Sequence, residues 1–368
     1  MKIVYVLTSL GVGGAERQVV ALAERMAARG HAVSLLVLRP QLSEEWPTTV
    51  DCLYLDMRKT PVSLIVGLAR GHRFLRGFNP EIVHSHVFPA NMAARLLRLC
   101  GATPPLISTV HNVYEGSSLR MWAYRLTDPL CRWTTAVSQA AADRYMRLKA
   151  VPAHKCSVLT NGIDTTEFAP NIERRVHMRE ELGAGDAFMW LTAGRLVAAK
   201  DYPNLLHAFA QVRAVAPEVQ LWIAGEAAGP DSVTVQGLAA ELKLEGSVLW
   251  LGLRRDMPAL LDAADGFVLG SAWEGMPLVV GEAMAMEKPV VATDVGGVRE
   301  LVGDAGTIVP HKKPDVLAQA MLDTMHNTPE ARRSLGRSAR ERIESQFSMG
   351  AKADEWETLY QHVLENNQ

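Results

Sequence analysis

The first forty residues restrict the fold more than any other part of the sequence. Residues 2–8 form a near-continuous apolar run, of the kind found in parallel sheets that helices cover on both faces. The run leads into the loop Leu10-Gly-Val-Gly-Gly-Ala-Glu-Arg17, then a helical segment that ends at Gly30, and then a second apolar run at residues 32–38. Strand, glycine loop, helix and strand in this order predict the opening βαβ unit of a Rossmann-like domain.

Short apolar runs alternate with helical segments through the rest of the chain. Further strands are expected at residues 82–86, 106–109, 134–137 and 156–159, and then at 188–193, 219–224, 248–251, 266–269, 290–292 and 307–309. A chain of 368 residues is too long for one ordinary core, so the pattern predicts two α/β domains, each a doubly wound parallel sheet. We place the domain junction at the turn Thr160-Asn-Gly-Ile-Asp164, which gives domains of residues 1–165 and 166–349.

Composition excludes several classes of protein. A hydrophobic fraction of 48% and a mean hydropathy of +0.02 are typical of a soluble globular protein. No apolar run reaches the roughly 18 residues of a membrane span. The scattered cysteines contain no C-x-x-C pair, which argues against a disulfide scaffold and against a cysteine zinc site: Cys52, Cys100, Cys131 and Cys156. We therefore expect a cytoplasmic protein.

Charge is distributed unevenly between the two halves. Residues 1–160 contain 19 Lys and Arg against 10 Asp and Glu, whereas the remainder carries a net charge of −11. This asymmetry predicts that the first half meets an anionic partner, either a membrane surface or an acidic acceptor. Residues 67–78 support a membrane surface because Arg70, Arg73 and Arg76 alternate with apolar residues, although an ordinary solvated helix gives the same pattern. No interleaving of aromatic and basic residues supports nucleic acid as the partner.

The first glycine loop does not match the dinucleotide fingerprint. Glycine lets the backbone approach a ligand closely, but Glu16 stands where the third glycine of G-x-G-x-x-G belongs. The second strand ends in Arg39-Pro40 and lacks the acidic residue that would bind a ribose, so NAD is disfavoured. Arg39 leaves NADP open, and a purely structural turn also remains open.

Three histidines fall near strand ends in the first half. His84 and His86 share one strand face, and His111 follows the next strand. A zinc site is disfavoured because no acidic or cysteine partner stands at ligand spacing. His111 and Asn112 lie just past the carboxyl end of a strand, where open α/β sheets bind ligands. They are the better functional candidates, and the other two histidines are expected in the core or at its rim.

The stretch of residues 271–293 carries the strongest chemical signal. It contains a polar turn with Glu274, a Pro at position 277, a helical run with Glu282 and then a strand. The start of the helix offers an anion seat. If the segment were helical throughout, the two carboxylates would lie roughly on one side, about 12 Å apart. Carboxylates accept hydrogen bonds from vicinal diols, so the pattern favours phosphate flanked by sugars, while an amphipathic helix with two solvated glutamates is the alternative.

Two cations follow the first strand of the second half. Arg195 and Lys200 would bind phosphate, Arg as a fork and Lys as a point charge, although ordinary loop cations fit equally well. No D-x-D pair of carboxylates is present to hold Mg²⁺ or Mn²⁺ in the usual way. Cationic side chains must then balance any phosphate charge.

Taken together, these motifs resemble the retaining GT-B glycosyltransferases of family 4. The resemblance covers nearly the whole chain, in the same order along it, and it depends on these motifs: Gly13-Gly14-Ala-Glu-Arg17, His111-Asn112, Asn161-Gly-Ile-Asp164, Gly194-Arg195-Leu196 with Lys200, Glu274-Gly-Met-Pro-x4-Glu282, Pro289-Val-Val-Ala-Thr293, and Gly296-Gly297 with Glu300. It implies two Rossmann-like domains facing across a cleft. The first, residues 1–165, would bind the acceptor, with the C-terminal helix at 350–368 packing back on it. The second, residues 166–349, would bind a nucleotide-sugar donor.

The resemblance also implies roles for individual residues. The residues implied in catalysis are His111, Glu274, Arg195 and Lys200. The donor would contact Gly13, Gly14, Arg195, Lys200, Arg254, Glu274, Gly275, Met276, Pro277, Leu278 and Glu282. The acceptor would contact Gly14, Arg17, His111, Asn112 and Asn161. No metal and no cofactor is expected. Two departures from the family pattern are Glu287, where a helix-ending Gly is common, and a longer turn at residues 225–230.

The implied reaction is hexosyl transfer with retention of configuration. UDP is the expected nucleotide of the donor, and GDP is the alternative. The basic first half favours a lipid-linked saccharide or polysaccharide acceptor in cell-envelope or exopolysaccharide synthesis, with the protein peripheral at the inner face of the plasma membrane. The departing phosphate would take the acceptor proton, so no protein nucleophile is assigned. The rival functions are a nucleotide-sugar epimerase of the same fold, and a non-catalytic partner that binds nucleotide sugar or membrane.

Overall fold

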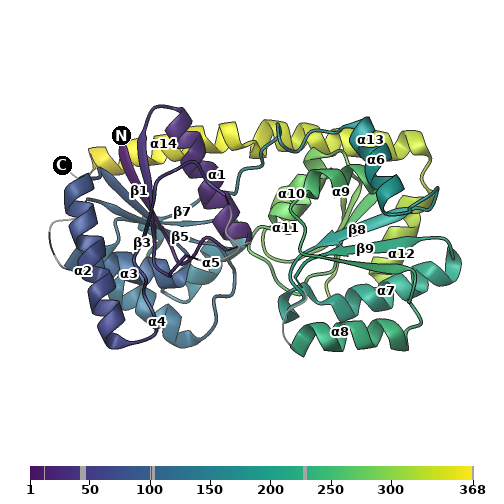
Figure 1. Cartoon of the computed structure of the whole chain (residues 1–368), viewed down its shortest axis with the longest axis horizontal. Coiled ribbons are helices and arrows are strands. Elements are labelled where there is room, and N and C mark those ends of the chain that lie inside the picture. The colour runs from purple at the N-terminus through teal and green to yellow at the C-terminus, as the bar shows by residue number, and fades with distance from the viewer. Residues whose placement is uncertain (12, 42–46, 100, 102–103, 227–229, 367–368) are drawn as a thin grey trace. The chain divides into compact units, whose positions relative to one another are not determined.

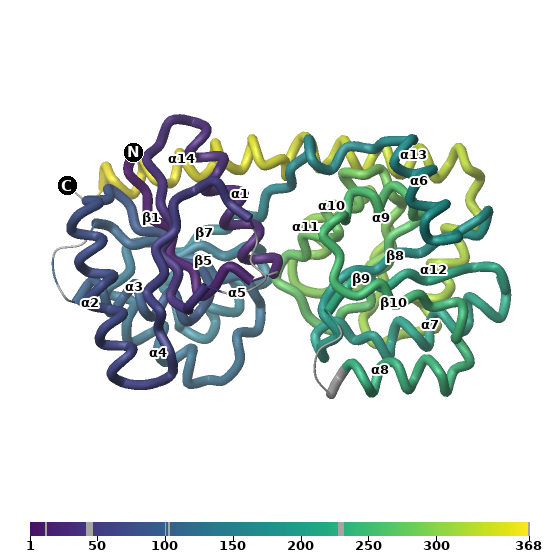
Figure 2. The backbone as a smooth tube through the Cα atoms, in the orientation of Figure 1, coloured from purple at the N-terminus to yellow at the C-terminus, as the bar shows by residue number. Residues whose placement is uncertain are grey.

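The computed structural model describes residues 1–11, 13–41, 47–99, 101, 104–226 and 230–366 (Figure 1). The chain divides into two compact units. Unit 1 comprises Met1–Gly162 together with Met349–Gln368, and unit 2 comprises Ile163–Ser348. The backbone trace in Figure 2 shows the C-terminal segment, in yellow, returning to the unit that contains the N-terminus.

Unit 1 is built around one parallel sheet. Its strands are β1 (Lys2–Leu7), β2 (Ala32–Val37), β3 (Cys52–Tyr54), β4 (Ile82–His86), β5 (Leu106–Val110), β6 (Trp133–Ala136) and β7 (Cys156–Val158). Its helices are α1 (Gly14–Ala28), α2 (Pro61–Phe78), α3 (Phe88–Leu99), α4 (Ser118–Thr127), α5 (Gln139–Arg147) and α14 (Met349–Glu365), with 3-10 turns η1 (Asp128–Leu130) and η2 (Ala153–Lys155). Within the described residues the strand order is β3-β2-β1-β4-β5-β6-β7.

Strand β1 shows how this sheet is covered on both faces. Ile3, Tyr5 and Leu7 pack into a core with residues of α1 and α14. Val4 and Val6 point the other way, into a second core with residues of α2 and α3. A strand buried on both faces favours apolar residues at successive positions, which explains the continuous run in the sequence.

Unit 2 repeats this arrangement. Its strands are β8 (Met189–Ala193), β9 (Gln220–Ala224), β10 (Val248–Gly252), β11 (Gly266–Leu269), β12 (Val290–Thr293) and β13 (Thr307–Val309). Its helices are α6 (Ile172–Glu181), α7 (Tyr202–Val215), α8 (Pro230–Glu241), α9 (Met257–Ala263), α10 (Leu278–Ala285), α11 (Val298–Val302), α12 (Pro314–His326) and α13 (Pro329–Arg342), with η3 (Ala198–Lys200) and the π-helical turn η4 (Ile343–Phe347). The parallel strands of the described residues are ordered β10-β9-β8-β11-β12-β13.

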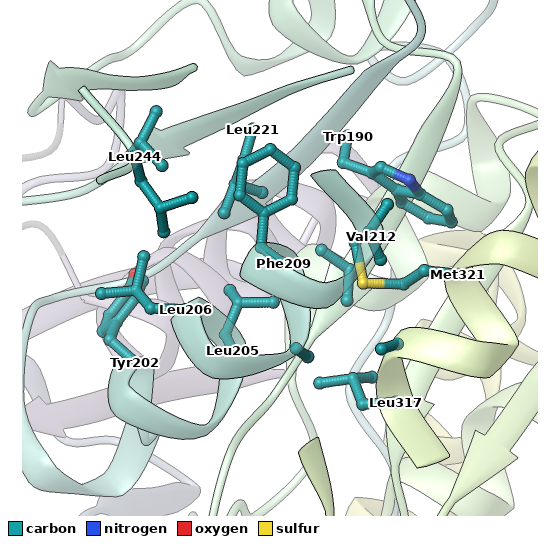
Figure 3. Close-up of a cluster of buried hydrophobic side chains, with 14 of the residues drawn as sticks. Trp190, Tyr202, Leu205, Leu206, Phe209, Val212, Leu221, Leu244, Leu317 and Met321 are labelled. Carbon is teal, nitrogen blue, oxygen red and sulfur yellow. The ribbon is translucent and has the colours of Figure 1, made fainter. Parts of the chain in front are cut away.

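The core of unit 2 lies between this sheet and helices α7 and α12. Phe209 and Val212 of α7 pack beside Trp190 of β8 and Met321 of α12 (Figure 3). All four side chains are fully buried. Helix α7 begins at Tyr202 with a Pro in its first turn, which sets the backbone for a helix without losing a needed donor.

The predicted fold class is confirmed: both units are Rossmann-like, with doubly wound parallel sheets. In each sheet the strand order reverses beside the first strand, between β1 and β4 and between β8 and β11. Open α/β sheets bind ligands at such switch points. Strand β3 was not predicted, because it has three residues at the edge of its sheet and is too short to show an alternating pattern.

Glu287 and the longer turn at residues 225–230 are the two predicted departures from the family pattern. Glu287 adopts the left-handed conformation, with φ +57°, so the turn after α10 keeps a glycine-type backbone although a glutamate occupies it. The longer turn at 225–230 falls largely on residues 227–229, outside the described residues.

None of the helices in the described residues combines the length and the hydropathy that a membrane span requires.

Candidate functional site

The loop after β8 begins with a glycine that no other residue could replace without strain. Gly194 has φ +151°, and a Cβ there would lie 2.7 Å from the side chain of Lys200. A Cβ on Gly225 would lie 1.9 Å from the carbonyl oxygen of Gly194. Tyr202 also donates a hydrogen bond of 2.6 Å to that oxygen. The loop is therefore held tightly, with the Lys200 chain lying across Gly194.

Lys200 and Glu274 meet where this loop faces the loop after β11. Lys200 Nζ lies 2.6 Å from Glu274 Oε1, although 74 positions separate the two residues in the sequence. Their side chains are 19% and 13% exposed. Because the two loops follow β8 and β11, the ion pair lies at the topological switch point of unit 2.

The Glu274 carboxylate is held through one of its two oxygens. Oε1 accepts hydrogen bonds from Lys200 and from Ser271 Oγ, the latter at 2.7 Å. Thr293, the last residue of β12, in turn donates to the Ser271 carbonyl at 2.7 Å. These contacts fix the carboxylate through Oε1, and a carboxylate has a second oxygen that can accept a hydrogen bond from a ligand hydroxyl.

A pair of glycines supports the same loop from the other side. Gly296 has φ +55°, and a Cβ there would lie 2.1 Å from the Glu274 carbonyl oxygen. The backbone N–H of Gly297 donates to the Gly275 carbonyl at 2.7 Å. The loop that carries Glu274 can therefore take this position only if residue 296 has no side chain.

Helix α10 begins just after the predicted polar turn. It spans Leu278–Ala285 with Pro277 as its N-cap, so Glu274 lies in the preceding loop, as the sequence indicated. The spacing of about 12 Å was conditional on a segment that is helical throughout, and it does not apply here. Glu282 is 2% exposed within the helix, Met276 is buried in the loop, and Gly275 and Pro277 are also buried. The Val280 N–H donates to the Pro277 carbonyl at 3.2 Å, so the N–H groups of Leu278 and Val279 are the ones that the first turn of α10 can direct at an anion.

The two predicted arginines of unit 2 differ in their surroundings. Arg195 is exposed in the loop after β8, and in the described part of the chain it forms no ion pair. Arg254 follows β10, and its guanidinium contacts Asp256 at 2.5 Å, Glu181 at 3.7 Å and the sulfur of Met178. The structure brings Lys200 and Glu274 together, whereas Arg254 contacts its neighbour Asp256 and two residues of α6.

Ser271, Thr293 and Tyr202 were not predicted as site residues. The first two are polar residues at or just beyond the carboxyl ends of β11 and β12. That position in a parallel sheet was a usable signal. Nothing in the sequence indicated that Tyr202 would reach back to Gly194.

In unit 1, the glycine loop after β1 leads directly into α1. Gly13 is the N-cap, and the Glu16 carboxylate lies so close that a Cβ on Gly13 would be 2.3 Å from it. Gly14, the first residue of α1, is exposed, and Arg17 is half-buried. The start of α1 therefore lies at the switch point of unit 1, where open α/β sheets bind ligands.

A chain of buried polar side chains crosses the core of unit 1. His84 Nε2 lies 2.7 Å from Thr109 Oγ1, and His84 Nδ1 lies 2.8 Å from the Tyr360 hydroxyl of α14. Tyr360 in turn lies 3.1 Å from the Tyr5 hydroxyl. His84 is therefore a hydrogen-bonded core residue, as expected. Burial lowers its pKa well below 6.5.

His111 lies at the end of this chain, beside His86. His86 Nδ1 and His111 Nε2 are 3.0 Å apart, so one ring donates a hydrogen bond to the other. Burial lowers the pKa of His111 to about 4. His111 and Asn161 line one small cavity of about 10 Å³, together with Gln18, whose amide oxygen accepts a hydrogen bond from the Gly162 N–H. Within the described residues, no group of three His, Cys, Asp or Glu side chains could hold a metal ion.

Asn112 has a structural task in the loop after β5. Its side-chain oxygen accepts a hydrogen bond of 3.1 Å from the Tyr114 N–H. Glu115 follows, 9% exposed, and its carboxyl accepts a hydrogen bond from the Tyr124 hydroxyl at 3.0 Å. Burial raises the pKa of Glu115. The loop that begins at His111 is thus fixed in place by polar contacts on both sides.

Comparison with known proteins decides the family. The model described as Glycosyltransferase Family 4 matches residues 12–167, and the model described as Glycosyl transferases group 1 matches residues 174–342. The chain belongs to glycosyltransferase family 4. It is a glycosyltransferase with the GT-B fold.

The relatives of this glycosyltransferase are distant but cover most of its length. Alpha-D-kanosaminyltransferase from Streptomyces kanamyceticus is 26% identical, over 93% of this chain and 98% of the relative. An Escherichia coli UDP-Gal:alpha-D-GlcNAc-diphosphoundecaprenol alpha-1,3-galactosyltransferase is 25% identical, over 80% and 79% of the two chains. Among solved structures, Anabaena HepE in complex with UDP and glucose superposes with a TM-score of 0.86 at 23% identity, covering 98% of this chain and 99% of HepE. At that identity the likeness shows the fold alone.

Proposed function

We propose that this glycosyltransferase transfers a hexose from a UDP-sugar to a saccharide acceptor with retention of anomeric configuration and without a metal ion. The observation that carries the proposal is the Lys200–Glu274 pair beside the start of α10. It places a cation, a carboxylate and free helix N–H groups at one switch point. A sugar nucleotide requires this set, since its diphosphate is anionic and its sugar offers hydroxyls.

The charged groups of unit 2 match the charge that develops in the reaction. As the anomeric C–O bond breaks, negative charge grows on the departing diphosphate. Lys200 is already oriented by Glu274, and its ammonium group has further N–H donors for a phosphate oxygen. Arg195 is exposed in the same loop and can add a bidentate contact. Positive groups fixed in advance lower the barrier because they need no reorganisation during the reaction.

Glu274 is proposed to position the sugar rather than to attack it. A carboxylate that accepts hydrogen bonds from Lys200 and Ser271 on one oxygen is a weakened nucleophile. Its other oxygen remains able to hold a sugar hydroxyl, while Glu282 would hold the ribose. In this scheme the acceptor oxygen bonds to the anomeric carbon on the face that the diphosphate leaves, and the departing phosphate oxygen takes the acceptor proton.

Unit 1 is proposed to bind the acceptor, through Gly14, Arg17, His111 and Asn161. Burial keeps His111 neutral near pH 7, so it can accept or donate a hydrogen bond without adding charge. The galactosyltransferase relative acts, by its name, on a diphosphoundecaprenol-linked sugar. A lipid-linked or polysaccharide acceptor in cell-envelope or exopolysaccharide synthesis agrees with the positive charge of this half.

We also propose that unit 1 rests on an anionic membrane at its cytoplasmic face. Helix α2 supports this, though by a different part than the sequence suggested. Its C-terminal half packs Leu75 into the core, with Arg70, Arg73 and Arg76 exposed. Its N-terminal half exposes apolar side chains at Val62, Leu64, Ile65 and Val66. Apolar residues next to cations on one helix are typical of an interfacial surface.

The experiment that tests the function is a donor screen followed by product analysis. Thermal unfolding is measured with UDP, GDP, ADP and their common sugars, in EDTA and then in Mg²⁺. Binding stabilises the protein by about 2.7 kcal/mol at a hundredfold excess over Kd. We expect a stabilising shift with UDP and UDP-sugars that EDTA does not remove, and a product with the anomeric configuration of the donor by NMR.

Other outcomes would favour the rival functions. Conversion of the donor sugar without an acceptor would indicate an epimerase. Donor binding with no transfer to any saccharide would indicate a non-catalytic partner. Failure to bind anionic vesicles at low salt would remove the membrane part of the proposal and leave the transfer reaction in place.

A further inference from the structure

Unit 1 contains a second, larger cavity beside the loop that follows β5. It has a volume of about 320 Å³ and lies between the loop after β5 and helices α4 and α5. Tyr114 and Trp122 line it, together with Arg125 and Arg144. This volume is in the range of small-molecule sites, and one sugar residue fits within it.

The two arginines give this cavity a positive wall. Arg125 comes from α4 and Arg144 from α5, and across the described residues neither forms an ion pair with a carboxylate. Three nearby carboxylates have other partners: Asp128 pairs with Lys155, Asp143 accepts a hydrogen bond from the Gln139 amide, and Glu115, which also lines the cavity, accepts one from the Tyr124 hydroxyl. Guanidinium groups that are not neutralised by the protein favour an anionic ligand, which they can bind through two hydrogen bonds.

Each arginine is stacked on an exposed aromatic ring. The Arg144 guanidinium carbon lies 5.4 Å from the centre of the Tyr114 ring, and that of Arg125 lies 5.7 Å from the centre of the Trp122 ring. Tyr114 is 51% exposed and Trp122 is 57% exposed. Stacking restrains the cations before a ligand arrives, and the rings present flat apolar faces to the C–H groups of a sugar.

The cavity is continuous in sequence with the candidate acceptor residues. Asn112 holds the backbone of Tyr114, so the segment that begins at His111 also forms one wall of the cavity. A second anchor is Arg120, which donates to the Glu115 carbonyl at 2.6 Å. The cavity is thus a fixed part of the loop that carries His111, at the carboxyl edge of the sheet.

We infer that this cavity is a subsite for an anionic sugar residue of the acceptor, one that carries a carboxylate or a phosphate. Arg125 and Arg144 bind the anionic group, and the Trp122 ring packs on the sugar. The inference rests on the proposed saccharide acceptor and adds its chemical class. A neutral sugar lacks the group that the two cations recognise.

The test follows the fluorine NMR resonance of Trp122 in the whole 368-residue chain. The chain is labelled with 5-fluorotryptophan, and the Trp122 resonance is assigned with Trp122→Phe. Methyl β-glucuronide and glucose 6-phosphate are titrated as the two kinds of anionic sugar, with methyl β-glucoside as the neutral control. We expect a saturable shift with at least one anionic sugar and none with the glucoside. Which of the two sugars binds distinguishes a carboxylate from a phosphate.

Matched variants separate the cavity from the general positive charge of unit 1. Arg125→Gln and Arg144→Gln should each weaken binding by about tenfold, as expected for loss of a charge-assisted hydrogen bond. Arg147→Gln removes an exposed arginine of α5 that does not line the cavity, and it should leave the affinity unchanged. Thermal unfolding of each variant shows whether it is folded.

Three results would overturn the inference: no saturable shift with either anionic sugar, an equal shift with the glucoside, or an equal loss in Arg147→Gln. Inorganic phosphate that binds as tightly as glucose 6-phosphate would also overturn it, because the site would then recognise an anion and no sugar. UDP binding is measured in parallel by calorimetry. If the unaltered protein binds UDP but Trp122 does not respond to any anionic sugar, this subsite alone is refuted. If the unaltered protein does not bind UDP, the proposed function is refuted.

Discussion

Replacing Gly296 with alanine should damage the donor site more than it damages the fold. The new Cβ would lie 2.1 Å from the Glu274 carbonyl oxygen, so that backbone must move by about 1 Å to reach an ordinary contact. The left-handed φ of +55° adds strain of roughly 1–2 kcal/mol. Overpacking of this kind adds about 1–3 kcal/mol. We expect a total loss of about 2–5 kcal/mol in the free energy of unfolding.

The loss of kcat/KM in Gly296→Ala should be larger than expected from the loss of stability alone. Glu274 holds Lys200 at 2.6 Å, so a displacement of the loop moves both groups of the ion pair. A misplacement of about 1 Å can lower a rate about 100-fold. The assay is urea unfolding together with kcat/KM for the donor that the thermal screen identifies. Gly246→Ala is the matched control, because Gly246 also has a positive φ, +76°, but a Cβ there meets nothing within 4 Å.

Comparing Gly296→Ala with Gly246→Ala separates displacement of the Glu274 loop from backbone strain alone. Gly246→Ala should lose roughly 1 kcal/mol of stability through backbone strain and keep its activity. If Gly296→Ala keeps kcat/KM within about twofold of the unaltered enzyme while it remains folded, the loop does not need the position seen here. The proposed role of the Glu274 loop would then be wrong.

Three further predictions concern charge, backbone and pH. Lys200→Met should lower the affinity for UDP about tenfold by calorimetry, whereas Glu274→Gln should lower kcat and leave UDP affinity within about threefold. Glu287→Gly should leave the Tm unchanged or raise it, because relief of left-handed strain of about 1 kcal/mol is partly offset by the flexibility of glycine in the unfolded chain; a clear fall in Tm would contradict this. The lowered pKa values of His84 and His86 mean that the unfolded chain binds more protons than the native chain below pH 6.5. The free energy of unfolding is therefore highest above pH 6.5, where both histidines are neutral in the native and the unfolded chain. As the pH falls below 6.5, it decreases by up to about 1.4 kcal/mol per pH unit for each histidine. Hydrogen exchange in β4 between pH 7.5 and 5.5 measures this, and equal protection at both values would refute it.

The sequence predicted what depends on local pattern. Continuous apolar runs located every strand except β3, and the histidines of β4 were correctly expected in the core. What it could not predict were contacts between residues far apart in the chain. The Lys200–Glu274 pair joins positions 74 residues apart, and His84 meets Tyr360 across 276 positions. Such pairs follow from strand order and helix packing, which no local periodicity encodes.

The long-range contacts of unit 1 also connect its C-terminal helix to the loop that begins at His111, which we propose binds the acceptor. Tyr360 of α14 anchors His84, the His84 ring lies 4.0 Å from the His86 ring, and His86 is hydrogen-bonded to His111. Each group in this series is buried or partly buried, so a shift of one must be taken up by its neighbour. Only one proton can lie between His86 and His111, which keeps the pair from carrying a charge on both rings. His111 is thus linked through His86 and His84 to a helix that begins more than 230 residues later, at Met349, while burial of His111 lowers its pKa. We expect removal of α14 to shift the loop that begins at His111, although no residue of the helix belongs to that loop.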